Sequence, residues 1–170
     1  MNRIACHIAA AILFGAGASA AHADEAVMPP SGSALLLERV ADGVQIYTCE
    51  SKEGRFEWTF QAPEANLFDK QDRQTGTHFG GPTWKMVDGS AVIGEVIAKA
   101  DAPEPDAIPW LLLRAKSHEG TGTLSAVDYV RRTDTKGGGA PRTGCDANHV
   151  SEHARMRYSA TYQFFGAAKR

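Results

Sequence analysis

The segment RMRYSATYQF, residues 155–164, decides the fold class of this chain. Apolar and polar side chains alternate along it, so that one face carries Met156, Tyr158, Ala160, Tyr162 and Phe164. A period of two is typical of a strand with one face in a core and the other toward solvent. We therefore predict a half-buried β-strand near the C-terminal end of the chain.

The preceding sequence shows the same short period, interrupted by turn residues. Residues 55–62 place Phe56, Trp58, Phe60 and Ala62 on one face. Asp-Gly pairs between apolar runs are typical of hairpins, which we predict around Ala41-Asp42-Gly43 and around Asp88-Gly89-Ser90. The polar stretch from Pro63 to Gly76 is predicted to be a long loop.

Counting these runs gives about eight or nine strands, and no helical period is longer than a turn or two outside the N-terminal segment. Short strands joined by Gly, Asp and Pro turns are typical of an antiparallel sandwich or barrel. We therefore expect an all-β fold with long loops.

The N-terminal segment has the composition of a secretory signal. Arg3 supplies a positive start, residues 4–18 form an apolar run, and Ala21-His22-Ala23 fits the small-residue rule for signal peptidase. We expect residues 1–23 to be removed as a signal peptide. This implies an exported protein, either periplasmic or secreted.

The remaining chain has the length of one domain. Residues 24–33 contain Pro29-Pro30 and are predicted to form a flexible lead. Residues 34–170 are then expected to form a single β-rich domain. No later stretch approaches the roughly 20 apolar residues that a transmembrane helix needs, so we predict no membrane span.

Two cysteines remain after removal of the signal peptide, Cys49 and Cys145. An even number of cysteines in an exported chain favours a disulfide, and only one pairing is possible here. The alternative is two buried free thiols.

The charge is nearly balanced, with 18 Lys and Arg against 20 Asp and Glu and a formal net charge of −2. This balance gives no electrostatic basis for binding nucleic acid. The composition leaves the oligomeric state open.

The segment His149-Val150-Ser151-Glu152-His153 matches the pattern of inverted zinc proteases, which needs a helix to place both histidines on one face. Here it lies between a glycine-rich loop and a predicted strand, and no Asp or Glu follows His153 to complete the ligand set. We therefore expect a solvated loop and no metal, with a looser site at His149 and His153 as the alternative.

Residues 15–20 loosely match a dinucleotide-binding fingerprint. No strand precedes them, and they belong to the expected signal peptide. We therefore predict no cofactor.

His78 lies in a glycine-rich segment, Gly76 to Pro82, where the backbone can turn tightly. It is the candidate catalytic residue, with Asp88 or a loop carboxylate such as Asp69 or Asp72 as partner. The structural alternative is a packed, hydrogen-bonded histidine.

Trp84 and Trp110 lie near predicted turns, whereas Trp58, Tyr158 and Tyr162 lie on apolar faces of predicted strands. Exposed aromatic side chains suit a sugar or a small apolar ligand. We therefore predict Trp84 and Trp110, together with His78, as ligand-binding residues, with the two tryptophans acting as surface platforms.

An ordered series of segments resembles one known family. The series comprises residues 43–49, 58–63, 76–78, 81–84, 88–94, 108–112 and 158–165. The chain is similar, from about Leu35 to Phe165, to the family called domain of unknown function 3455, whose members are exported bacterial and fungal proteins. The resemblance implies export and a single β-rich domain, and it assigns no activity, cofactor or catalytic residue.

These observations favour a non-catalytic exported domain that binds a small molecule, a glycan or another envelope protein. The first alternative is a small enzyme, hydrolase-like or metal-dependent, that uses His78. The second is a purely structural envelope protein.

Overall fold

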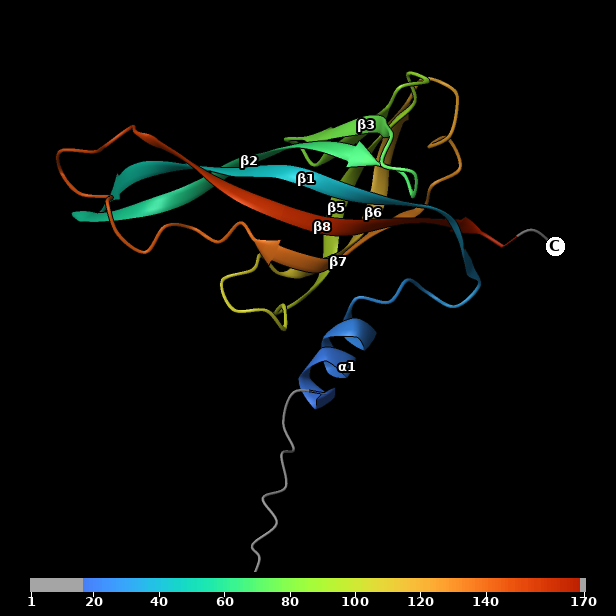
Figure 1. Ribbon diagram of the computed structural model, residues 1–170, viewed down its shortest axis with the longest axis horizontal. Coiled ribbons are helices and arrows are strands. Elements are labelled where there is room, and N and C mark those ends of the chain that lie inside the picture. Colours follow the sequence, from blue (N-terminus) through green and yellow to red (C-terminus); the bar gives the residue numbers. More distant parts are fainter. Residues whose placement is uncertain (1–16, 169–170) are drawn as a thin grey trace, which may run out of the picture.

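The computed structural model describes residues 17–168, in which one helix is followed by eight strands (Figure 1). The elements are α1 (Gly17–Ala26), β1 (Ser33–Lys52), β2 (Arg55–Phe68), β3 (Gln74–Phe79), β4 (Thr83–Met86), β5 (Ala91–Ala100), β6 (Trp110–Glu119), β7 (Tyr129–Gly137) and β8 (His153–Ala167). Each strand pairs with the next in antiparallel fashion, and β8 pairs with β1 to close a barrel. The predicted all-β fold of about eight antiparallel strands is confirmed, and of the two predicted architectures, sandwich or barrel, the structure has the barrel.

The predicted strand near the C-terminal end is β8, which pairs with β1 on one side and with β7 on the other. Its inward-facing residues Tyr158, Ala160, Tyr162 and Phe164 are all buried. The alternation in the sequence therefore predicts correctly which face of this strand lies in the core.

The predicted hairpin at Asp42-Gly43 is wrong, because β1 runs through both residues without a turn. Gly43 pairs with Ala65 of β2 and with Tyr158 of β8. A Cβ atom at Gly43 would lie 2.2 Å from the Glu64 carbonyl oxygen and 2.5 Å from the Ala65 Cα. The glycine therefore serves a close approach of β1 and β2 rather than a turn.

The predicted long loop from Pro63 to Gly76 is also wrong in its first half, because β2 continues to Phe68. Ala65 and Leu67 are buried and alternate with exposed neighbours, as in any half-buried strand. The actual turn covers residues 69–73, where the Asp69 carboxylate accepts backbone N–H groups from Gln71 and Arg73.

The predicted turn at Asp88-Gly89-Ser90 is confirmed: it joins β4 to β5, and Gly89 has a φ of 86°. A further tight turn closes the β1–β2 hairpin, where Glu53 and Gly54 both have positive φ angles, of 52° and 78°. Two such residues are the signature of a tight hairpin turn whose twist matches that of the strands.

The predicted disulfide between Cys49 and Cys145 is present, with the two Cα atoms 5.3 Å apart. It ties β1 to residues 138–152, the connection between β7 and β8, which we call the disulfide loop. The Trp58 indole N–H donates to the Thr143 carbonyl at 2.9 Å, and the backbone of Cys49 exchanges hydrogen bonds with Ser151 and Glu152. The disulfide loop is thus fastened along the β1–β2 hairpin.

The first sixteen residues of the predicted signal peptide lie outside the described residues, and Gly17–Ala26 forms α1 beside the barrel (Figure 1). Ala23 and Val27 pack against Trp110 and Leu112 of β6. Within residues 17–168, no helix has the length and apolar character needed to cross a membrane. The boundaries of the signal peptide, the lead and the domain stay predictions.

Much of the barrel interior is filled by apolar side chains from several strands and from the β6–β7 connection. This cluster includes Ala41, Leu67, Met86, Val92, Leu124, Val127, Val130 and Phe164. It continues to Trp84, Leu113 and Tyr162, which border the part of the interior that side chains leave open.

Candidate ligand-binding cavity

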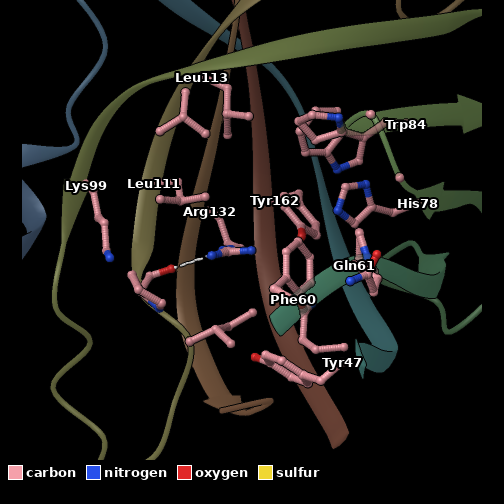
Figure 2. Close-up of a pocket in the computed structure, with 18 residues that line it drawn as sticks. Tyr47, Phe60, Gln61, His78, Trp84, Lys99, Leu111, Leu113, Arg132 and Tyr162 are labelled. Carbon is pink, nitrogen blue, oxygen red and sulfur yellow. Dashed lines mark hydrogen bonds between the residues drawn. The ribbon is translucent and has the colours of Figure 1, made fainter. Parts of the chain in front are cut away.

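A cavity of about 490 Å³ occupies the open part of the barrel interior (Figure 2). An eight-stranded barrel is wide enough to hold one small ligand. Ligand sites in proteins commonly enclose roughly 300–1,000 Å³. The cavity therefore has the size of a site for one small organic molecule.

The walls of the cavity are mainly apolar. Trp84 and Tyr162 contribute aromatic surface, and Leu111 and Leu113 contribute aliphatic surface from β6. The two leucines point inward because residues two apart on a strand share a face. Toward solvent, Phe60 is 49% exposed and also lines the cavity, so an apolar ligand would meet an apolar mouth.

His78 points into the barrel from β3, one strand position after the outward-facing Thr77. Its ring stacks on Trp84, with centroids 4.5 Å apart, and meets the Tyr162 ring edge-on at 4.9 Å. Its Nδ1 lies 2.9 Å from the Thr83 carbonyl oxygen. A carbonyl only accepts, so Nδ1 carries the hydrogen and Nε2 of the neutral ring is an acceptor.

Burial, together with the nearby Arg132 guanidinium, lowers the pKa of His78 to about 3, although the hydrogen bond with the Thr83 carbonyl acts in the opposite direction. The ring is therefore neutral at physiological pH. It offers the cavity a hydrogen-bond acceptor and no charge.

Arg132 enters the cavity from β7. Its Nε and Nη2 donate to the Pro109 carbonyl oxygen at 3.0 and 2.8 Å, and one of these bonds is drawn in Figure 2. Lys99 of β5 lies toward the same side of the cavity in this view, and His78 and Trp84 lie on the other. The cavity is thus asymmetric, with cations on one side and stacked rings opposite.

Polar side-chain atoms are buried around the cavity, among them Gln45 Nε2, Trp84 Nε1 and Tyr162 OH. The Tyr158 hydroxyl, which does not line the cavity, interacts with the side chains of Tyr162 and Gln45. The Trp84 indole N–H has no hydrogen-bond partner among the described residues. Buried polar groups in folded proteins are nearly always hydrogen-bonded, to protein or to water. The Trp84 N–H is therefore the donor left for a molecule in the cavity.

The phenols of the interior carry no negative charge at neutral pH. Burial raises the pKa of Tyr158 far above its usual range, and it raises the pKa of Tyr47 as well. Tyr47 also donates its hydroxyl to the Gly138 carbonyl at 2.6 Å, which joins the cavity wall to the disulfide loop.

Two of the predicted ligand-binding residues, His78 and Trp84, line this cavity together. The interpretation of Trp84 and Trp110 as surface platforms is wrong, because they are only 1% and 7% exposed. Trp84 faces the barrel interior, and Trp110 packs against Ala23 and Val27 outside it. Proximity to a turn does not make a tryptophan exposed here, because Trp84 lies within β4 and Trp110 within β6.

The predicted carboxylate partners of His78 lie elsewhere. Asp88 accepts hydrogen bonds from Ser90 and Thr123, and these bonds hold its pKa well below its usual range. It thereby fastens the β4–β5 turn to residues 122–125. Asp69 caps the β2–β3 turn with Arg73, and among the described residues that line the cavity none is an Asp or a Glu.

His149 and His153 do not share a helical face, because residues 146–151 form turns and His153 begins β8. His149 Nδ1 lies 2.7 Å from the Asp146 carboxylate, which raises the pKa of His149. His153 Nδ1 lies 2.9 Å from the Thr48 hydroxyl. In the part of the chain that the structure describes, no three His, Cys, Asp or Glu residues cluster in a way that could hold a metal ion.

Sequence reasoning did not single out Arg132, Lys99, Gln45 or Tyr47. Arg132 follows Arg131, and two adjacent residues of a strand face opposite sides. The pair itself signalled that one arginine would face inward, but not which one.

One comparison with known proteins identifies a family. The model of a family described as "Protein of unknown function (DUF3455)" matches residues 30–166, from just before β1 to near the end of β8. No curated protein and no solved structure matches the chain.

Proposed function

Because this chain belongs to the DUF3455 family, which carries no assigned function, we propose a role from its own cavity: the protein binds one small, largely apolar molecule inside the barrel without transforming it. The molecule enters past Phe60 and Val96, which lie at the open side of the cavity. It then contacts the rings of Trp84 and Tyr162.

The single observation that carries this proposal is the incomplete filling of the barrel. Apolar side chains fill part of the interior, whereas about 490 Å³ beside them is left open and is lined by Trp84, whose indole N–H has no partner among the described residues. A void lined by apolar side chains loses dispersion contacts, and an unpaired buried polar group loses its hydrogen bonds with water. A ligand with an apolar body and a few polar atoms would supply the missing dispersion contacts and the missing hydrogen bonds.

A non-catalytic role is supported by the surroundings of His78. A general base needs a proton to abstract within reach and an operating pKa near the working pH. The His78 ring is fixed between Trp84 and the Thr83 carbonyl, and its pKa of about 3 is far from neutral. We assign to it the positioning of a ligand N–H or O–H group.

Among the candidate ligands, a small molecule fits better than a glycan or an envelope protein. Sugar recognition commonly uses exposed aromatic faces, and Trp84 and Trp110 are buried. A cavity with one open side and a mainly apolar wall suits a compact molecule.

Export belongs to the same proposal. Disulfides persist in oxidising compartments, and this chain has one between Cys49 and Cys145, two residues that are 96 positions apart in the sequence. The sequence of the first residues has the pattern of a secretory signal. The ligand would therefore be a molecule of the periplasm or of the extracellular medium.

The test is a titration with phenylnaphthylamine, a neutral dye that becomes fluorescent in apolar surroundings. We expect saturable binding of one dye per chain to the wild type. Leu111→Trp fills the cavity and should weaken binding by about tenfold or more, since a few lost contacts are worth at least 1.4 kcal/mol. Val87→Trp adds the same side chain at a turn position that is 78% exposed, and it should bind like the wild type.

Equal affinity in the Leu111→Trp variant and in the wild type would overturn the proposal. Thermal unfolding of each variant shows whether the barrel is intact, and Leu111→Phe is the smaller replacement if the tryptophan does not fit.

A further inference from the structure

The barrel cavity contains a cation that has no counter-ion. Arg132 uses Nε and Nη2 to bind the Pro109 carbonyl oxygen, and no carboxylate of the described residues forms an ion pair with it. Its other terminal nitrogen, Nη1, has no partner within residues 17–168. The guanidinium therefore presents free N–H groups to the cavity.

This arrangement differs from that of the adjacent arginine of the same strand, which is buried on the outer face of the barrel. Arg131 points away from the cavity, where it pairs with the Asp24 carboxylate and binds the Gln163 amide oxygen. Charged groups in poorly hydrated surroundings are normally paired, because leaving water costs far more than an unpaired charge recovers. Arg131 follows this rule within the chain, whereas Arg132 does not.

The second cation at the cavity is also without an ion pair in the described part of the chain. Lys99 lies exposed at the mouth, in β5. The Glu95 carboxylate, the nearest acid along the same strand, pairs with Arg114 on the outer surface of the barrel. The charge of the cavity is thus positive from its mouth to Arg132.

The remaining polar groups of the cavity do not offset this charge. His78 is neutral and accepts at Nε2, and Gln45, Trp84 and Tyr162 are neutral as well. None of them removes a proton from a neutral ligand to create the missing anion, so the negative charge has to arrive with the ligand.

Resting on the proposed function, we propose that the ligand is an organic anion: an apolar, preferably aromatic body that bears one acidic group, a carboxylate or a sulfonate, with two oxygens side by side. The acidic group binds the free N–H groups of Arg132, a geometry that guanidinium matches better than an ammonium does. The apolar body lies between Leu111 on one side and the stacked pair of His78 and Trp84 on the other (Figure 2). Lys99 attracts the anion to the mouth.

An inorganic anion is disfavoured by the same walls. Phosphate or sulfate would place its remaining oxygens against Leu111, Leu113 and Phe60, none of which donates a hydrogen bond. A neutral apolar molecule would fill the space but leave Arg132 unpaired.

The test compares two dyes with the same aromatic body. Phenylnaphthylamine is neutral, and anilinonaphthalene sulfonate carries one negative charge. For the wild type we expect the anionic dye to bind at least about tenfold more tightly, since hydrogen bonds to a charged group contribute about 1.5–3 kcal/mol. Arg132→Gln should lower this ratio of affinities by about tenfold or more, and Arg132→Lys should lower it less.

Arg114→Gln is the matched control, because it removes the same charge from the outer face of the barrel, where Arg114 pairs with Glu95. The ratio should stay at the wild-type value in this variant. If the ratio falls equally in Arg114→Gln and Arg132→Gln, the preference arises from overall charge, and the assignment to Arg132 is overturned.

The two proposals fail separately. If the neutral dye binds and the anionic dye binds no more tightly, the cavity is a ligand site but the inference about an anion is wrong. If neither dye binds, the proposed function itself is wrong and the inference falls with it.

Discussion

The imidazole of His78 lies flat against the indole of Trp84, with ring centroids 4.5 Å apart and planes inclined by 11°. The two residues face each other directly in the β3–β4 ladder. Because both side chains point into the barrel, the ladder itself creates the stack. It removes His78 from water and gives the cavity one polar atom, Nε2, on an otherwise apolar wall.

This burial makes the stability of the protein depend on pH. The pKa of His78 is about 3 in the folded chain and 6.5 in its usual environment. Between these values only the unfolded chain binds the proton, so the free energy of unfolding falls by about 1.4 kcal/mol for each unit that the pH decreases. Above the higher value the titration of His78 adds no further pH dependence.

His78→Gln should therefore show a smaller loss of stability on acidification than the wild type, since glutamine keeps a donor for the Thr83 carbonyl but does not titrate. Urea unfolding at a series of pH values measures the difference, in which the protonation of carboxylates common to both proteins cancels. If the free energy of unfolding changes with pH equally in the two proteins, folding does not lower the pKa of His78, and the ring takes up its proton in the folded barrel as well.

The disulfide should contribute most of the margin of stability. Cys49 and Cys145 are 96 residues apart, and the chain-entropy model gives about 4 to 5 kcal/mol for a loop of that size. The double variant Cys49→Ala, Cys145→Ala should lose about this much in urea unfolding. Reducing agent should destabilise the wild type to the same level and leave the double variant unchanged; an effect on the variant would point to a different thiol.

Gly43 should be intolerant of any side chain. The Cβ atom of alanine would overlap the backbone of Glu64 and Ala65, so Gly43→Ala forces β1 and β2 apart. We expect a loss of about 1–3 kcal/mol, the usual cost of overpacking. Asp42→Ala removes only an exposed pair with Arg157 and should cost less than about 1 kcal/mol. Equal losses in the two variants would contradict the close approach seen here.

These residues also show why the sequence predicts some elements and not others. The core face of β8 and the Asp88-Gly89-Ser90 turn follow from local alternation and turn chemistry, and both are correct. The Asp42-Gly43 pair has the same local pattern as a turn, but Gly43 is required by its close contact with Ala65 on the neighbouring strand. Such a contact depends on which strands become neighbours, and no local pattern contains that information.

Only part of the candidate site could be predicted from the sequence, because most of it also depends on which strands become neighbours. His78 stood out because its glycine-rich surroundings are local to it. Arg131 and Arg132 are adjacent, so the starting point of β7 decides which of them meets Asp24 and which enters the cavity. The tryptophans were misplaced because their distance from a turn says little about burial.

The segment that precedes β1 should contribute to stability through one side chain. Val27 is fully buried against β6, whereas its neighbour Met28 is 50% exposed. Val27→Ala should lower the free energy of unfolding by about 1–2 kcal/mol, and Met28→Ala by less than about 0.5 kcal/mol. Thermal or urea unfolding of the exported protein measures both. Similar, negligible effects would mean that this segment is detached from the barrel in solution.

The central claim, that the barrel cavity is a ligand site, is tested most directly by NMR of the three tryptophan indole N–H groups. Trp84 lines the cavity, whereas Trp58 donates to the disulfide loop and Trp110 packs beneath α1. On titration of isotope-labelled protein with phenylnaphthylamine, we expect the Trp84 signal to move and saturate while the Trp58 and Trp110 signals stay in place. A stationary Trp84 signal, or movement confined to the other two, would contradict the account.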